Sequence, residues 1–309
     1  RRSVGNFQKA IELVHTGKIG NLKTMHASVY VPELGNAWLA AEPTPPRTEI
    51  DWNLWLGVAP VREYSPELAP RKWRGFWDFG TGALGDMGCH ILDPVFRILP
   101  IDFPTEVECS TTTAWEGFFK EANYLESCPS SSIIHLKYPR KDGKGTLRLT
   151  WMDGGLLPER PEELLPDEQM GDYNGGVIFE GTKGKMIGNY AMPPVLLPTS
   201  RMKDVTLPAP TLARVPEGHY VQWVNACLKG FGKAELSSPF DYAGPFAESV
   251  LMGNLAIRSY NIKTKSADGK QTFYPGRKKL LWDAKNMKIT NFDEANAFVK
   301  REYRTGWTL

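Results

Sequence analysis

Apolar residues recur at three- and four-residue spacing in five stretches of the chain, which is the spacing of one face of an α-helix. The first covers residues 4–16, with Ser3 as a candidate N-cap. The central one follows a run of glycines and extends through Met87 to Leu99. Further helices are predicted over residues 218–228, 246–257 and about 292–303.

Alternating apolar and polar residues, with many β-branched side chains, predict strands in the middle of the chain. Residues 141–144 suit a hairpin turn, and the stretch 175–190 is interpreted as a second hairpin that turns at 181–184. The other predicted strands cover residues 22–31, 107–113, 131–138, 145–152 and 280–283. Strands in the middle and helices at the ends favour an α+β fold with a largely antiparallel sheet.

The composition is that of a globular protein, with 41% apolar and 23% charged residues among 309. A net charge of +2 gives no reason to expect nucleic acid as a partner, and no apolar run is long enough to expect a membrane. The four cysteines show no C-x-x-C spacing and are interpreted as buried or free thiols. Ten tryptophans and 24 prolines indicate long ordered loops with aromatic anchors, of the kind that line sugar-sized pockets.

A glycine motif opens the central helix. Residues 80–85 (GTGALG) satisfy G-x-G-x-x-G, and Asp102 follows about twenty residues later, as in a dinucleotide-binding fingerprint. That fingerprint needs a buried aliphatic strand before it, whereas residues 71–79 are bulky, charged and aromatic. We therefore expect these glycines to let the backbone pass close to a bound ligand or to another segment.

Asp86 and His90 stand four residues apart, so a helix projects both side chains from one face. In one interpretation Asp86 caps the helix and His90 is a core histidine bonded to Asp93. In the other, His90 exchanges a proton with a substrate hydroxyl while Asp86 orients the ring or the hydroxyl. A metal site is the weaker alternative, because the pair supplies two ligands and no third is identifiable nearby.

The chain resembles the C-terminal domain of the Gfo/Idh/MocA family, named after glucose–fructose oxidoreductase and inositol dehydrogenase. The resemblance covers essentially the whole chain, and the long central motif carries it. The matching stretches are GKIGNLK at 17–23, DWNLWLG at 51–57, WRGFWDFGTGALGDMGCHILD at 73–93, FEGTKGKM at 179–186, AESVLMGNLAIRS at 247–259 and KITNFDEANAFVKREYRTGW at 288–307.

The resemblance implies an open, mostly antiparallel sheet with flanking helices, of the dihydrodipicolinate-reductase-like kind, whose face mediates homo-oligomers. It also implies an N-terminal Rossmann domain that holds NAD or NADP. The family's D-x-x-x-H motif matches Asp86 and His90. In relatives the histidine transfers a proton at the carbon that is oxidised, and the aspartate holds the substrate.

The chain departs from the family pattern at its start. No glycine-rich βαβ unit precedes the first helix, the Glu-Lys-Pro catalytic segment is missing, and residue 1 is not Met. We therefore expect residues 1–20 to be a residual helix and crossover from a missing Rossmann domain, and residues 21–309 to be the substrate-binding and oligomerisation domain. The chain alone is expected to bind no dinucleotide tightly and to be inactive.

The leading hypothesis is an intact enzyme that uses NAD(P) to oxidise a hydroxyl of a sugar, cyclitol or glycoside. One alternative is a redox-neutral, NAD-dependent enzyme that cleaves glycosides. Another is a non-catalytic carbohydrate-binding or assembly module. Five residues are expected on the substrate side, where they would stack on the sugar or bond its hydroxyls: Trp73, Arg74, Trp77, Asp78 and His219.

Overall fold

The computed structural model of the chain describes residues 3–29, 44–98, 101, 103–122, 125–143, 145–173 and 175–308. Parts of several predicted elements lie outside these residues, namely residues 30–31 of the first predicted strand, Leu99, Asp102 and residue 144 of the first hairpin turn. In the part of the chain that is described, no helix is long and apolar enough to cross a bilayer.

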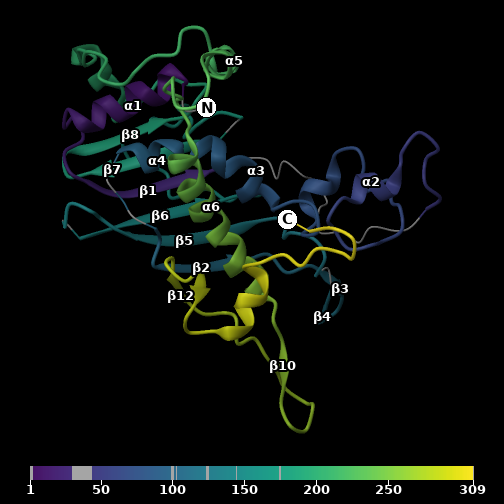
Figure 1. The fold of residues 1–309 in the computed structure, drawn as a ribbon. Helices are drawn as coiled ribbons and strands as arrows, with labels where there is room; N and C mark the ends of the chain where they lie inside the picture. The colour runs from purple at the N-terminus through teal and green to yellow at the C-terminus, as the bar shows by residue number, and fades with distance from the viewer. Residues whose placement is uncertain are drawn as a thin grey trace.

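The described strands build one large, mostly antiparallel sheet of nine strands, in the order β13-β12-β2-β5-β6-β1-β7-β8-β9 (Figure 1). The predicted α+β class is therefore confirmed. Both predicted hairpins, β5–β6 and β7–β8, pair antiparallel as expected. The strands are β1 (Leu22–Ser28), β2 (Glu106–Thr111), β5 (Ser132–Pro139), β6 (Thr146–Met152), β7 (Gly176–Gly181), β8 (Gly184–Gly188), β9 (Val195–Leu196), β12 (Leu280–Asp283) and β13 (Lys288–Ile289).

Strand β1 lies between β6 and β7, and it pairs parallel with β6 but antiparallel with β7. Alternation along the strands sends one set of side chains to each face of the sheet. On one face Met25, Leu149 and Leu136 are fully buried. On the other face His26, Thr150 and His135 follow one another across neighbouring strands. The sheet thus has one apolar face covered by helices. Its other face is polar over β1, β5 and β6 but carries a small buried apolar cluster over β7 and β8, with Ile178 and Ile187.

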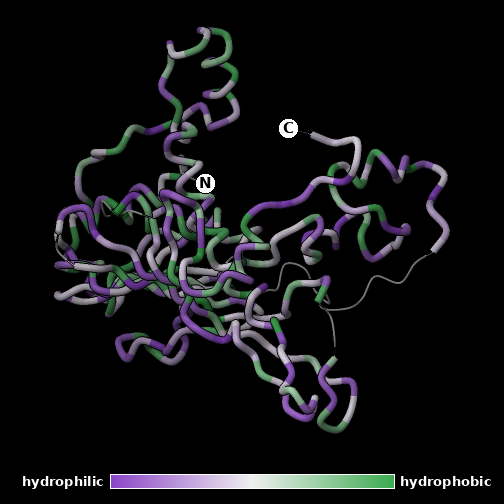
Figure 2. Tube along the Cα trace, turned by 60° about the horizontal axis from the view of Figure 1, so that its bottom comes forward, coloured by the Kyte–Doolittle hydropathy of each residue, from purple (hydrophilic) through white to green (hydrophobic). Residues whose placement is uncertain are grey.

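Helices cover the apolar face (Figure 1). The long helix α6 packs against β2, β5 and α3, and α1 packs against α4. Helix α5 stands away from the sheet at one end of the molecule (Figures 1 and 2), and large apolar side chains such as Trp223 and Leu228 are exposed on it. The helices are α1 (Gly5–His15), α2 (Trp52–Leu56), α3 (Gly82–Ile91), α4 (Asp93–Ile98), α5 (His219–Lys229) and α6 (Phe240–Tyr260).

Shorter elements complete the described chain. Two small hairpins, β3–β4 and β10–β11, are joined by Glu121, whose carboxylate accepts hydrogen bonds from Lys263 Nζ at 2.7 Å and Tyr274 Oη at 2.8 Å. Their strands are β3 (Trp115–Gly117), β4 (Lys120–Glu121), β10 (Thr264–Lys265) and β11 (Thr272–Phe273). Three 3-10 helices are η1 (Lys72–Gly75), η2 (Thr199–Asp204) and η3 (Asp293–Phe298).

Three helix predictions need correction. The N-cap of α1 is Val4, without a side-chain hydrogen bond, and not Ser3. The central helix is divided at Leu92 into α3 and α4, because Pro94 has no N–H to bond to the preceding turn. The helix predicted over 292–303 is only the 3-10 helix η3, after which the chain is extended.

The C-terminal tail is held by the segments that precede the central helix. Arg301 donates a hydrogen bond to the carbonyl oxygens of Trp77 and Asp78. Arg304 donates to the Gly57 carbonyl oxygen at 2.6 Å and to Asn53. The backbone N–H of Arg304 also donates to the Val58 carbonyl oxygen, so the tail runs extended against residues 53–78.

Candidate functional site

Helix α3 presents Asp86 and His90 one turn apart, and both side chains are partly buried. The opposite side of the helix carries Leu84 and Ile91 into the core, each at most 1% exposed. This apolar side fixes the rotation of α3 and so aims the polar pair outward from the core. The N-cap of α3 is Thr81, so the interpretation of Asp86 as the helix cap is wrong.

Arg74 pairs with Asp86. Its Nε lies 3.3 Å from Asp86 Oδ1, and it reaches α3 from the 3-10 helix η1. The guanidinium also stacks on the neighbouring Trp73, with Cζ 4.5 Å from the ring centre. Two of the residues predicted for the substrate side, Trp73 and Arg74, therefore lie beside Asp86. The positive charge of Arg74 holds the Asp86 carboxylate in place.

Gly80, two residues before α3, allows two backbone segments to touch, and Gly85 within α3 makes room for the Thr81 side chain. A Cβ on Gly80 would lie 2.1 Å from the Arg74 carbonyl oxygen, and one on Gly85 would lie 1.7 Å from Thr81 Oγ1. The preceding residues form η1 and a turn, with no strand of a βαβ unit. The motif therefore sets the position of Arg74 and does not fit a dinucleotide cradle.

A tyrosine that the sequence reasoning missed lies beside His90. The rings of His90 and Tyr190 are 6.3 Å apart between centroids and inclined by 57°. The preceding Asn189 is 1% exposed and fixes this turn. Its amide donates to Asp172 and to the Gly175 carbonyl, and its oxygen accepts the N–H groups of the two residues after Tyr190. No local pattern signals that the end of a strand about a hundred residues away reaches α3.

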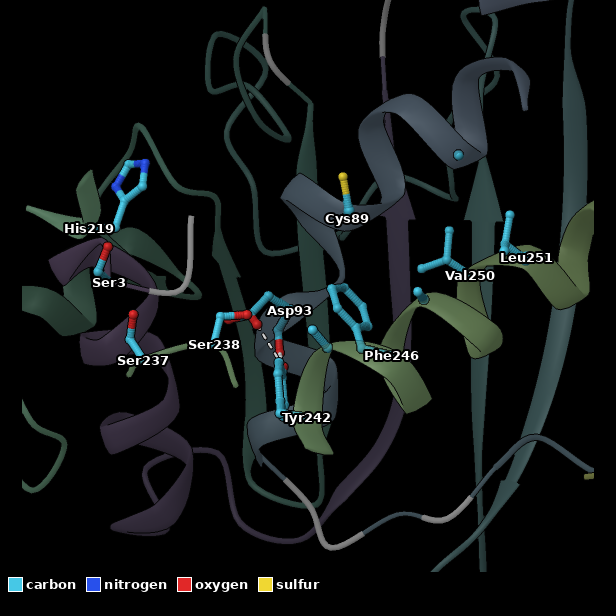
Figure 3. A pocket seen from close by; sticks show the side chains of 13 residues that line it. Ser3, Cys89, Asp93, His219, Ser237, Ser238, Tyr242, Phe246, Val250 and Leu251 are labelled. Carbon is cyan, nitrogen blue, oxygen red and sulfur yellow. Dashed lines mark hydrogen bonds between the residues drawn. The ribbon is translucent and has the colours of Figure 1, made fainter. Parts of the chain in front are cut away.

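A cavity of about 390 Å³ opens along the neighbouring stripe of α3 (Figure 3). Cys89 and Asp93 line its α3–α4 side, and Tyr242 of α6 donates a hydrogen bond to Asp93 Oδ1 at 2.6 Å. His219 lies at one end of the cavity and Leu251 at the other (Figure 3). His219 is exposed at the first position of α5 and shares this cavity with Cys89, while Asp86 and His90 do not line it.

Trp77 and Asp78 lie away from Asp86. The Trp77 ring faces Arg258 of α6, with Arg258 Cζ 5.6 Å from the ring centre. Asp78 Oδ2 lies 3.7 Å from Arg62 Nη1. The substrate-side prediction therefore divides into three groups. Trp73 and Arg74 lie beside Asp86, and His219 lines the neighbouring cavity. Trp77 and Asp78 contact Arg258 and Arg62 instead.

Residues 29–117 match the family model for the C-terminal alpha/beta domain of the Gfo/Idh/MocA oxidoreductase family. The matched stretch is less than a third of the chain, and it contains Trp73, Arg74, Asp86 and His90. No curated protein sequence matches the chain.

The chain is distantly similar to several solved structures. An NAD-binding protein from Listeria innocua is 15% identical, with a TM-score of 0.42 over 89% of this chain and 65% of that one. An oxidoreductase from Thermotoga maritima is 15% identical, with a TM-score of 0.39 over 91% of this chain and 60% of that one. A levoglucosan dehydrogenase in complex with NADH and levoglucosan is 12% identical, with a TM-score of 0.41 over 82% and 61%.

This chain therefore spans 60–65% of the length of those three structures. None of the three TM-scores reaches 0.5, so no property of these proteins is transferred to this chain.

Proposed function

We propose that this chain is the substrate domain of an NAD(P)-dependent oxidoreductase that acts on a hydroxyl of a sugar, cyclitol or glycoside. One observation carries the proposal: Asp86 and His90 leave the same side of α3, next to the Arg74 guanidinium, inside the stretch that matches an oxidoreductase family model.

In this proposal His90 is the general base. An imidazole titrates near neutral pH, so it accepts a proton from the substrate hydroxyl as the carbon that bears it is oxidised. Asp86 accepts a hydrogen bond from a neighbouring substrate hydroxyl. The Arg74 guanidinium orients Asp86, and stacking of the guanidinium on Trp73 restricts the rotamers available to Arg74.

The glycine motif at 80–85 does not fit a dinucleotide cradle, because Gly80 packs directly on the Arg74 backbone. The proposal therefore assigns to this chain the substrate and the proton, and no part of the hydride transfer. Tyr190 closes one side of the substrate position, because its ring stands beside the His90 ring.

The test is the His90→Ala variant of the protein that contains this chain together with its cofactor domain. Turnover is expected to fall by at least about tenfold, since positioned acid–base catalysis contributes about 10² to 10⁴ in rate. The matched control is His135→Ala, which removes a histidine from the polar face of the sheet. An unchanged rate for His90→Ala would contradict the assignment.

The same assay separates net oxidation from a redox-neutral cleavage. Net oxidation accumulates one NADH or NADPH for each substrate molecule consumed. Cleavage of a glycosidic bond without accumulation of reduced cofactor would overturn the proposed reaction, whatever the effect of His90→Ala.

A further inference from the structure

Arg258, in the last turn of α6, lies between two aromatic rings. Its Cζ is 4.3 Å from the centre of the Phe298 ring and 5.6 Å from that of Trp77. Stacking of this kind fixes the plane of the guanidinium while leaving its N–H groups at the edge. No described residue forms a hydrogen bond or an ion pair with Arg258.

The surroundings of Arg258 disfavour its positive charge. Burial lowers the pKa of the guanidinium, the nearby Asp78 opposes this shift, and the charge of Arg301 adds to it. A partly buried cation without a hydrogen-bond acceptor is costly unless an anion approaches it. A negatively charged ligand at this position would therefore interact favourably with Arg258.

Two adjoining cavities lie near this residue, and Arg258 lines the larger one. One, of about 550 Å³, is lined by Arg258, Trp77 and Phe298. The next, of about 340 Å³, shares Asn261 with the first and extends to Trp115. Each volume lies in the range of small-molecule sites, and their shared walls make them one groove with two lobes.

The second lobe is rich in groups that bond hydroxyls. Its polar lining consists of Thr112, Thr113, Glu121, Ser127, Ser130, Asn261 and Lys263. Lys263 is already paired with Glu121 at 2.7 Å, so its charge is compensated within the protein. Among the described lining residues, Arg258 is therefore the cation that an anionic ligand would meet.

We propose that this groove binds a sugar acid, a pyranose ring that bears a carboxylate. The carboxylate receives two parallel hydrogen bonds from Arg258, the geometry in which arginine binds carboxylates most specifically. The apolar face of the ring lies against an aromatic wall, and the hydroxyls face Asn261 and the threonine and serine side chains of the second lobe. This site does not depend on the role proposed for His90.

The test is isothermal titration of the 309-residue chain with sodium glucuronate, with glucose and sodium acetate as comparison ligands. Glucuronate is expected to bind at least about tenfold more tightly than either, because only glucuronate offers both the carboxylate and the ring. No binding of glucuronate, or equal affinity for acetate, would overturn the proposal.

Two variants locate the site. Arg258→Gln is expected to weaken glucuronate binding by at least about tenfold, while Lys278→Gln is expected to leave it unchanged. Lys278 is an exposed cation stacked on Phe292 outside the groove, with Nζ 4.8 Å from the ring centre, so it controls for net charge. Equal binding by Arg258→Gln and the wild type would overturn the site.

Asn261→Ala decides the case in which Arg258→Gln fails to fold. Asn261 is the C-cap residue of α6 and lines both lobes, and its side chain can be removed without cutting a hydrogen bond to a described residue. Weaker glucuronate binding by this variant supports the groove, and unchanged binding overturns it. Neither result involves turnover, so failure here is distinguishable from failure of the proposed oxidoreductase function.

Discussion

Glu12 of α1 and Arg214 form a two-pronged ion pair across 202 positions of sequence, with Arg214 Nη1 2.9 Å from Glu12 Oε1 and Nη2 2.8 Å from Oε2. The Glu12 side chain is 1% exposed. It also accepts the backbone N–H groups of Thr211 and Leu212. A segment without regular structure is therefore fixed to the first helix by one carboxylate.

Glu12→Gln is expected to lower the free energy of unfolding by about 1–3 kcal/mol, because buried donors lose their charged acceptor. Burial alone would raise the pKa of Glu12, but the hydrogen bonds from Arg214, Leu212 and Thr211 and the Arg214 charge outweigh it, and the pKa is lowered. A lowered pKa stabilises the fold fully above the pKa of the unfolded chain, and this contribution is lost as the pH falls through the pKa of the folded state.

Urea unfolding at neutral and acidic pH checks this expectation. The difference between the wild type and Glu12→Gln should be largest at neutral pH and shrink on acidification. Glu116→Gln is the control, since Glu116 pairs with Lys120 on the surface and such pairs contribute little. An equal difference at both pH values would mean that charge on Glu12 does not matter.

Gly80→Ala is expected to destabilise the chain by about 1–3 kcal/mol and to disturb the candidate site without removing any polar group. The added Cβ would displace the backbone of Arg74 and with it the ion pair to Asp86. Gly5→Ala is the control, because nothing lies within 4 Å of a Cβ at that position of α1. Thermal melting of the two variants measures the contrast, and equal melting temperatures would show that η1 can move freely.

Asn254→Leu is expected to raise the stability by about 1–3 kcal/mol. Asn254 is 5% exposed, and neither its amide nitrogen nor its oxygen has a hydrogen-bond partner among the described residues. The matched control is Asn296→Leu, which should destabilise, because Asn296 bonds both the N–H and the carbonyl of Ile289. A lower urea midpoint for Asn254→Leu would show that a water or a ligand serves the buried amide.

The four thiols are expected to react in two classes. Cys89 and Cys227 are exposed and should be labelled rapidly by a disulfide reagent at mildly alkaline pH. Burial, together with the Glu108 charge, raises the pKa of Cys109 to about 12, and burial also raises that of Cys128. These two should be labelled only after unfolding. Rapid labelling of all four in the native chain would contradict the packing around Cys128.

Local patterns predicted the strands well. In β5, Ile134 and Leu136 are buried while His135 is not, and in β6 Leu149 follows the same alternation, so the pleat could be read from sequence. The helix predicted over 292–303 is wrong beyond Phe298: the apolar spacing is helical, but the chain there is extended, and both the backbone N–H and the side chain of Arg304 bond to residues 53–58. Such tertiary bonds leave no periodic signature.

The candidate site shows the same limit. The spacing of Asp86 and His90 is local, and the sequence placed them on one helix correctly. The ion pair from Arg74 depends on the close backbone approach at Gly80, and Tyr190 arrives through the pairing of β7 and β8. The division of Trp73 from Trp77, four residues apart in sequence, depends on the turn between η1 and α3, which no pattern of hydrophobic positions describes.

The place of β1 in the sheet constrains how the chain can fold. In the sheet, β1 is the link between two groups of strands, β13, β12, β2, β5 and β6 on one side and β7, β8 and β9 on the other, so the two groups do not pair with each other until β1 is in place. Its partners come from the middle of the chain, so most of the sequence must be synthesised and released before the sheet becomes continuous. Such long-range pairing is slow. Until then β6 and β7 each offer a free edge, so refolding yield should fall as protein concentration rises.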